Sequence, residues 1–137
     1  MGRILAVDYG QKRTGLAVTD VLHITANALE TVATQSLMAF LVDYATREQV
    51  ETFVVGMPKQ LNNQDSENAS HVKGFVKRLQ AQFPETKIVL YDERFTSALA
   101  HQTMRDAGLR KKARQDKALV DKISATIILQ DYLNSSM

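Results

Sequence analysis

The chain has 137 residues, of which 45% are hydrophobic and 23% are charged, values that are typical of one folded domain. We therefore expect a single domain over residues 1–137, with too little chain for two lobes around a cleft. No cysteine is present, which excludes disulfides and thiolate metal sites and fits a reducing cytoplasm. Because neither a signal peptide nor a run of about 20 apolar residues is evident, we expect a cytoplasmic protein without membrane contact. The net charge of +2 permits a nucleic-acid partner.

Three strands are expected first along the chain, because short apolar and β-branched runs follow one another across turn residues. The first strand covers residues 3–8 and the second covers residues 14–19. A weaker third strand is expected over residues 23–28. Such closely spaced strands fold back on one another, which predicts an antiparallel meander.

The rest of the chain alternates helices with strands. The expected elements are a helix at 34–47, a strand at 51–56, a polar loop at 57–66, a helix at 72–83, a strand at 87–91, a helix at 95–107, a polar and basic stretch at 109–117 and a helix at 118–133. Thr34 or Ser36 can cap the first of these helices, and Gly108 is a typical stop for the third. The order predicts an α/β fold: a mixed five-stranded sheet, antiparallel across its first three strands and parallel beyond, flanked by helices.

Asp8 ends the first expected strand, where the apolar layer of the sheet gives way to solvent. Gly10 follows it, and the absence of a side chain there lets a backbone or a phosphate approach closely. The alternative is a turn aspartate that accepts hydrogen bonds from local amides. Taken alone, Asp8 favours the turn, so its role depends on other acids further along the chain.

Asp92, Glu93 and Arg94 end the last expected strand in the same way. The carboxyl ends of parallel strands meet at one edge of a sheet, and ligand sites in open α/β sheets favour that edge. Asp8 and the Asp92–Glu93 pair can therefore converge although they are far apart in the sequence. The alternative is that Glu93 and Arg94 cap the following helix beside Thr96.

Asp121 lies one turn into the last expected helix, on a stripe of small and apolar residues. At helical spacing this stripe contains Ser124, Ala125, Ile128 and Leu129. The carboxylate is therefore expected to point towards the core, where an unpaired charge is costly. A metal ion shared with Asp8 and Glu93 would balance the charge, and a salt bridge to Lys117 or Lys122 is the alternative.

Three carboxylates at one sheet edge form an oxygen-only site, which suits Mg²⁺ or Mn²⁺ rather than zinc. An ion held in this way can activate a water molecule and stabilise the leaving oxygen of a phosphoryl displacement. The three histidines, His23, His71 and His101, show no ligand spacing. We expect them to be structural or solvent-facing, because lone histidines rarely bind metal without clustered partners.

Basic residues crowd the stretch before Asp121, with only Asp116 opposing them. A basic stretch beside an acidic metal site suits a polyanionic substrate, because the cations attract the phosphates that the metal site cleaves. A solvated run of charges is the alternative. The residues predicted to contact nucleic acid are Gly10, Lys12, Arg13, Arg94, Arg110, Lys111, Lys112 and Arg114.

Five short motifs, taken in order, resemble the YqgF family, also called RuvX, over essentially the whole chain. They are Asp8-Tyr9-Gly10, Gly15-Leu16-Ala17, Gly56-Met57-Pro58, the run from Asp92 to Ser97, and the run from Asp121 to Ala125. Each motif is weak alone, but all five in this order are specific. Two departures leave the acids untouched: Asn62-Asn63 stands where the family often has an Asx-Gly turn, and Ser124 stands where alanine is usual.

The resemblance implies a ribonuclease H-like fold in which Asp8, Glu93 and Asp121 are the catalytic and metal-binding acids. It also implies a nuclease that matures the 5′ end of 16S ribosomal RNA or resolves four-way DNA junctions. We favour the pre-rRNA nuclease, because junction resolution usually requires two active sites on a symmetric dimer and no dimer seam is evident. We expect a monomer or a weak homodimer.

Two other classes of protein are alternatives. Sugar kinases and actin-like ATPases open with a similar Asp-x-Gly hairpin, but they bind ATP between two such domains and this chain has room for one. A non-catalytic RNA-binding module would explain the basic stretch, although it would not explain three acids at one edge. Magnesium-dependent cleavage separates such a module from a nuclease.

Overall fold

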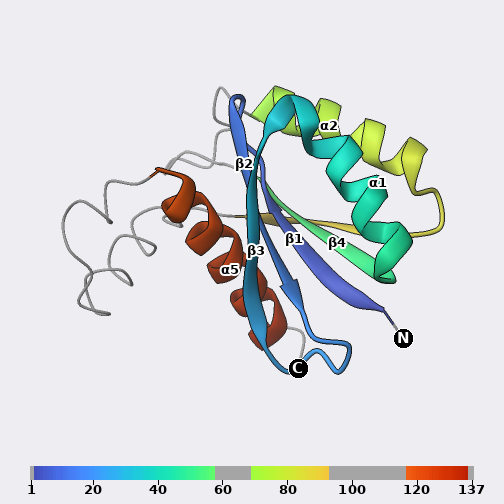
Figure 1. Cartoon of the computed structure of the whole chain (residues 1–137), viewed down its shortest axis with the longest axis vertical. Coiled ribbons are helices and arrows are strands. Elements are labelled where there is room, and N and C mark those ends of the chain that lie inside the picture. Colours follow the sequence, from blue (N-terminus) through green and yellow to red (C-terminus); the bar gives the residue numbers. More distant parts are fainter. Residues whose placement is uncertain (1, 58–68, 93–116, 136–137) are drawn as a thin grey trace.

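The computed structural model of the chain describes residues 2–57, 69–92 and 117–135 (Figure 1). The strands in these ranges are β1 (Arg3–Asp8), β2 (Arg13–Thr19), β3 (Ala26–Ala33), β4 (Val50–Met57) and β5 (Lys87–Asp92). The helices are the short 3-10 helix η1 (Thr34–Ser36), α1 (Leu37–Arg47), α2 (Ala69–Gln82) and α5 (Lys117–Ser135).

The five strands form a mixed sheet in the order β3-β2-β1-β4-β5. β1 pairs antiparallel with β2, and β2 pairs antiparallel with β3, whereas β1, β4 and β5 run parallel. Parallel neighbours need a crossover connection, which α2 provides between β4 and β5. The sheet architecture predicted from the sequence is confirmed.

Helices cover both faces of the sheet, with α5 on one face and α1 and α2 on the other (Figure 1). Successive side chains of a strand point to opposite faces. Leu5 and Val7 of β1 therefore belong to the core beneath α1 and α2, whereas Ile4 and Ala6 pack against α5. Because β1 is buried on both faces, its sequence is a continuous apolar run.

The third strand lies further along the chain than predicted, since β3 spans Ala26–Ala33 instead of residues 23–28. Its pairing with β2, in which Thr19 lies opposite Ala26, sets this position. β3 is an edge strand and is only partly buried, so it mixes polar and apolar residues. Its periodic signal in the sequence is correspondingly weak.

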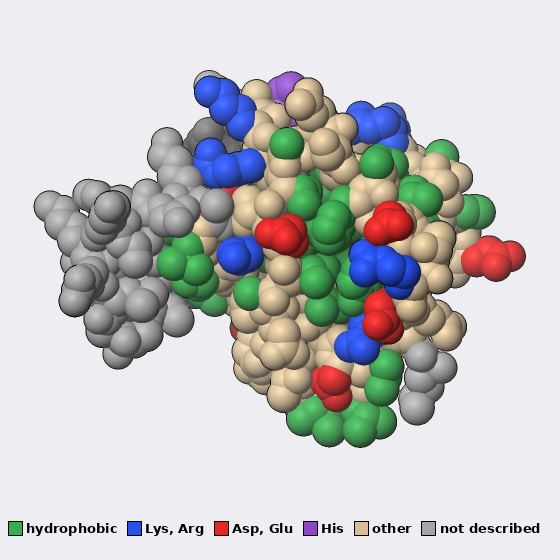
Figure 2. Space-filling model, viewed as in Figure 1, with side chains coloured by type: hydrophobic (Ala, Val, Ile, Leu, Met, Phe, Trp, Pro, Cys, Tyr) green, Lys and Arg blue, Asp and Glu red, His purple; other side chains and the backbone are tan. Residues whose placement is uncertain are grey.

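The residues before β3 form a turn around Asp20. Its carboxylate oxygen Oδ1 accepts hydrogen bonds from the amides of Ile24 and Thr25, both at 2.8 Å. The pKa of Asp20 is held below its ordinary value, chiefly by the hydrogen bond from the amide of Thr25. Desolvation of the carboxylate acts in the opposite direction and is outweighed. The turn exposes Val21, Leu22 and Ile24, which form an apolar tip at the lower end of the molecule in Figure 2.

The helix expected over residues 34–47 is divided into η1 and α1. Ser36 precedes α1 but makes no capping hydrogen bond with its side chain. Thr34 instead donates from Oγ1 to the carbonyl oxygen of Gly10 at 2.6 Å, and its amide donates to the carbonyl oxygen of Lys12 at 3.0 Å. The predicted capping role is wrong, because Thr34 ties the β1–β2 turn to the start of η1.

The other described elements agree with the sequence to within a few residues at their ends. Three expected segments lie outside the described residues: the loop at 57–66 except for its first residue, the helix at 95–107 with Gly108, and the stretch at 109–116. Within the ranges that are described, no helix is long and apolar enough to cross a membrane.

Candidate active site

Asp8 is the last residue of β1 and lies at the carboxyl end of the parallel strands. It continues the alternation of Ile4 and Ala6, so it is placed on the face of the sheet that α5 covers. Its partner across the antiparallel ladder is Gly15 of β2. Asp8 is partly exposed, so its position borders both the buried sheet and solvent.

Gly15 lets α5 approach the sheet beside Asp8. A Cβ atom at Gly15 would overlap the carbonyl oxygen of Asp121 and would lie 3.0 Å from the Cβ atom of Asp121. The missing side chain is therefore what permits this contact. Because Gly15 is paired with Asp8 and packed against Asp121, the fold brings these two acids from opposite ends of the chain to neighbouring positions.

Asp121 stands at the beginning of the buried stripe of α5. The stripe residues Ser124, Ala125, Ile128 and Leu129 are each no more than 2% exposed. The side chain of Asp121 itself is 20% exposed. The predicted stripe is confirmed, and it turns Asp121 towards the sheet at the point where α5 meets β2.

Arg13 is the first residue of β2 and shares the α5 face with Gly15. Its Nε atom lies 2.5 Å from Oδ2 of Asp121, and both atoms are shielded from solvent. Charge holds the two groups together, since the contact lacks the alignment of a good hydrogen bond. Lys117 or Lys122 is the alternative partner expected from the sequence; among the described side chains, Arg13 takes this place.

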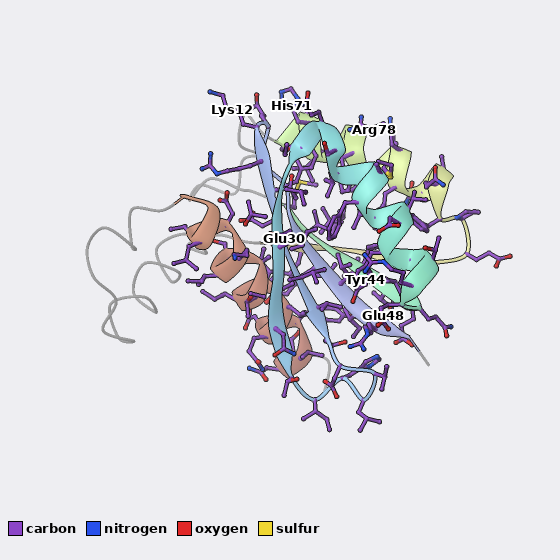
Figure 3. The ribbon with its side chains drawn as sticks, in the orientation of Figure 1. Lys12, Glu30, Tyr44, Glu48, His71 and Arg78 are labelled. Atoms are coloured by element: carbon purple, nitrogen blue, oxygen red, sulfur yellow. The ribbon has the colours of Figure 1, made fainter. Side chains whose placement is uncertain are left out.

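Gly10 and Lys12 lie in the turn between β1 and β2. A Cβ atom at Gly10 would overlap the carbonyl oxygen of Arg13. The close approach predicted at Gly10 is therefore made by the chain's own backbone, and contact with a phosphate stays a prediction. Lys12 is exposed near the upper end of the molecule (Figure 3).

β4 and β5 end at the same edge of the sheet as β1. Val7 pairs with Val55, and two residues further on Met57 pairs with Asp92. The predicted convergence of the strand ends is thus confirmed for the backbone.

Six predicted site residues lie outside the described residues: Glu93, Arg94, Arg110, Lys111, Lys112 and Arg114. In the part of the chain that is described, no three His, Cys, Asp or Glu side chains gather as a metal site.

The described histidines take no part in this site. His23 Nε2 lies 2.7 Å from the carbonyl oxygen of Gly2 and 3.4 Å from Glu51, beside the start of β1. His71 is exposed on α2. Both agree with the predicted structural or solvent-facing roles, and His101 lies outside the described residues.

Two features of the site were missed in the sequence: the packing role of Gly15 and the contact of Arg13 with Asp121. The first had a signal, because Gly15 and Ala17 are small residues in alternate positions and so share one face of β2. The second had none, because Arg13 and Asp121 are brought together by the packing of α5 on β2.

Comparison with known proteins relates the whole chain to one family. The family model RuvX, described as a Holliday junction resolvase, matches residues 2–135. A relative in Phocaeicola vulgatus, named "Putative pre-16S rRNA nuclease", is 59% identical over 135 residues, which are 98% of this chain and 97% of the relative. A relative of the same name in Flavobacterium johnsoniae is 56% identical over 135 residues, 98% of each chain.

Solved structures relate the fold to RuvC. T. thermophilus RuvC in complex with Holliday junction substrate matches with a TM-score of 0.61 at 18% identity, over 100% of this chain and 96% of the RuvC chain. Another structure of RuvC from Thermus thermophilus matches with the same TM-score, over 98% of this chain and 96% of that chain. At this identity the likeness shows the fold alone, which is the ribonuclease H-like fold predicted from the sequence.

Proposed function

The chain belongs to the RuvX family, and we propose that it is a metal-dependent nuclease that processes the 5′ end of precursor 16S rRNA. Relatives at 53–59% identity carry the name of a pre-16S rRNA nuclease. The observation that carries the proposal is the placement of Asp8 and Asp121 side by side through Gly15. Processing of ribosomal RNA would place the protein in the cytoplasm.

The proposed metal ligands are Asp8, Glu93 and Asp121, with Mg²⁺ or Mn²⁺ as the ion. Carboxylate oxygens are the ligands that these ions prefer. The donor set also fits a cation, because the Arg13 guanidinium is already drawn to Asp121. Glu93 directly follows β5, whose last residue lies at the carboxyl edge. When bound, the ion would activate water and stabilise the leaving oxygen of a displacement at phosphorus.

The chain's own residues would position the acids and the substrate. Asp8 ends a strand that is buried on both faces, so its backbone is held rigidly. Gly15 sets the distance between that strand and Asp121. Arg13, whose side chain is 37% exposed, can contact a phosphate from the same position in which it contacts Asp121. Exposed Lys12 would attract the phosphate backbone.

Resolution of four-way DNA junctions is the second candidate, and the description of the family model favours it. Two cuts at symmetric positions require two active sites, so this activity would need a homodimer. The rRNA nuclease needs a single site, which fits a monomer or a weak homodimer. The oligomeric state during cleavage therefore separates the two candidates as well as the substrate does.

The proposed function is tested by cleavage of precursor 16S rRNA and of a four-way DNA junction, each with and without Mg²⁺. We expect the wild type to cut the RNA only with the metal. Asp8→Asn is nearly isosteric, so it should keep the fold, and it should lower the rate by about two orders of magnitude or more because it removes a charged ligand. Asp43→Asn, on the exposed surface of α1, is the matched control and should cut normally.

Three outcomes would contradict the proposal in different ways. Cleavage of the junction without cleavage of the RNA would favour the second candidate. RNA binding without cleavage under any metal condition would identify a non-catalytic RNA-binding module. A stable Asp8→Asn variant with normal activity would remove Asp8 from the site.

A further inference from the structure

A cavity of about 320 Å³ lies at the same end of the molecule as Asp8, on the face opposite α5. It opens to solvent and is lined by the turn after β1, by η1 and the start of α1, and by α2. The lining residues are Tyr9, Leu37, Met38 and Phe75 on the apolar walls and Gln11, Thr34, Gln35 and Arg78 on the polar rim. This volume is at the small end of the range for ligand sites, so it suits one compact group.

The walls of the cavity are held in place by contacts within the fold. The rings of Tyr9 and Phe75 are stacked, with centroids 5.0 Å apart and an angle of 25° between their planes. The Thr34 hydroxyl donates its proton to the carbonyl oxygen of Gly10, so it accepts the hydrogen bond that the Thr14 hydroxyl donates at 2.9 Å. A preformed cavity binds with a smaller entropy cost than one that must be assembled.

The rim of the cavity is suited to an anion. Arg78 lines it, and none of its lining residues is an acid. His71, Phe75 and Arg78 share one stripe of α2, because they are separated by four and three residues. Figure 3 shows Lys12, His71 and Arg78 along the upper end of the molecule, and Figure 2 shows Lys and Arg side chains on both sides of that end.

The cavity and Asp8 are linked by the strand itself. Tyr9 follows Asp8 directly, and it belongs to the core beneath α1 and α2, whereas Asp8 is placed on the α5 face. A nucleic-acid strand that crosses the end of β1 can therefore contact both faces at once. We infer that the cavity receives one unstacked base of the substrate strand, next to the bond that is cut, and this inference rests on the proposed nuclease function.

The chemistry of the lining matches an unpaired nucleotide. Proteins that read single-stranded RNA place splayed bases against aromatic side chains and bond their edges with polar groups. The amides of Gln11 and Gln35 both donate and accept hydrogen bonds, as base edges do. The guanidinium of Arg78 can hold the phosphate of the same nucleotide through two parallel hydrogen bonds. A base inside a duplex cannot enter, so the cavity selects a single strand.

The first test measures binding without cleavage, in EDTA, with a ten-nucleotide RNA that has no secondary structure. The methyl NMR signal of Met38, assigned with the Met38→Leu variant, should shift on addition of this RNA. Arg78→Gln should weaken binding about tenfold, since it removes a charge-assisted contact. Lys77→Gln removes the same charge from the neighbouring exposed position of α2, outside the cavity, and should weaken binding less than about twofold.

The second test places one abasic nucleotide at successive positions across the cut site of the RNA substrate. We expect KM to rise about tenfold at one position in the wild type, because the base that the cavity receives is missing there. The inference is overturned if every position is neutral, if a duplex of the same sequence shifts Met38 equally, or if inorganic phosphate alone does so. The protein could show the Met38 shift and the weaker RNA binding of Arg78→Gln and yet cut no RNA. This result would support a base-binding cavity and contradict the proposed nuclease function.

Discussion

At the scale of single residues, Asp121 is both the ion-pair partner of Arg13 and a proposed metal ligand. Its charge is balanced by Arg13, and a metal ion at the proposed site would compete with that guanidinium for the same carboxylate. The two contacting atoms are shielded, but the side chains as a whole are 37% and 20% exposed, so solvent screens part of their attraction. The ion pair should therefore contribute about 1 kcal/mol or less to the free energy of unfolding.

This balance leads to a prediction for Asp121→Asn. In EDTA, the variant should be less stable than the wild type by about 1 kcal/mol or less, because Arg13 loses its partner. Magnesium should raise the Tm of the wild type, since a ligand that binds only the native state stabilises it. The variant should lack this rise, because the proposed site has lost a charged ligand. Thermal melts of both proteins with and without Mg²⁺ provide the measurement.

Asp43→Asn is the control for this experiment. Asp43 pairs with Arg47 at 3.0 Å on the exposed surface of α1, so its loss changes the charge equally without touching the site. Its response to magnesium should equal that of the wild type. If Asp121→Asn also keeps the full response, Asp121 is a structural partner of Arg13 and binds no metal.

At the scale of elements, the site depends on how closely α5 packs against β2. Gly15 is the contact point, and the packed face of α5 continues from it through Ser124 and Ala125. Interiors of this density leave no room for an added methyl group against a backbone carbonyl. The position of Asp121 relative to Asp8 is therefore coupled to a single missing side chain.

We predict that Gly15→Ala destabilises the protein by about 1–3 kcal/mol, because the added methyl group overlaps the backbone of Asp121 and α5 must move. Cleavage should fall even under conditions in which the variant is fully folded, since the two acids are displaced from each other. Urea unfolding gives the change in stability, and single-turnover cleavage gives the change in rate.

The matched control is Gly74→Ala in α2. A Cβ atom there would lie 3.6 Å from Nη1 of Arg78, an ordinary contact distance. Alanine is the better helix former, so this variant should be more stable than the wild type by about 0.5–1 kcal/mol. If Gly15→Ala is as stable and as active as the wild type, α5 does not set the geometry of the site.

At the scale of the whole molecule, the functional features gather at one end. The parallel strands direct their carboxyl ends there, and both termini lie towards the opposite end (Figure 1). The two faces of this end differ, with the acids beneath α5 and the cavity beneath α1 and α2. A net charge of only +2 means that attraction of RNA must come from local groups of basic residues.

The basic segment, which comprises Arg110, Lys111, Lys112 and Arg114, is predicted to supply part of that attraction. Changing Lys111 and Lys112 to Gln should weaken RNA binding across different sequences. It should also lower the slope of log K against log salt by about one for each phosphate contact that is lost. The cleavage rate at saturating RNA should change less, because these residues attract the substrate and do not react. Binding titrations at several salt concentrations provide the measurement.

A control at the far end of the molecule replaces Arg47 and Lys87 with Gln. Both are exposed, Arg47 at the end of α1 and Lys87 at the start of β5, away from the carboxyl edge. This pair removes the same total charge and should leave the slope nearly unchanged. An equal loss of slope in both variants would show that the basic segment acts only through net charge.

The sequence by itself determined most of the sheet and placed two of the three acids correctly in the fold. The apolar runs of β1 and β4 identify strands that are buried on both faces, and the stripe of α5 identifies its packed side. Asp8 and Asp121 are placed by these same patterns, because each stands at a defined point of a periodic element. Glu93 stays a prediction, as it lies outside the described residues.

Only the tertiary structure decided the position of β3, the partner of Thr34 and the contact between Arg13 and Asp121. In each case the outcome depends on residues that are distant in the chain: β3 is set by its pairing with β2, and Thr34 bonds to Gly10. Periodicity within a segment reports which face is buried, but it carries no information about which distant side chain meets that face. The same reason explains why Gly15 could be quoted in a motif while its contact with Asp121 had to be seen in the fold.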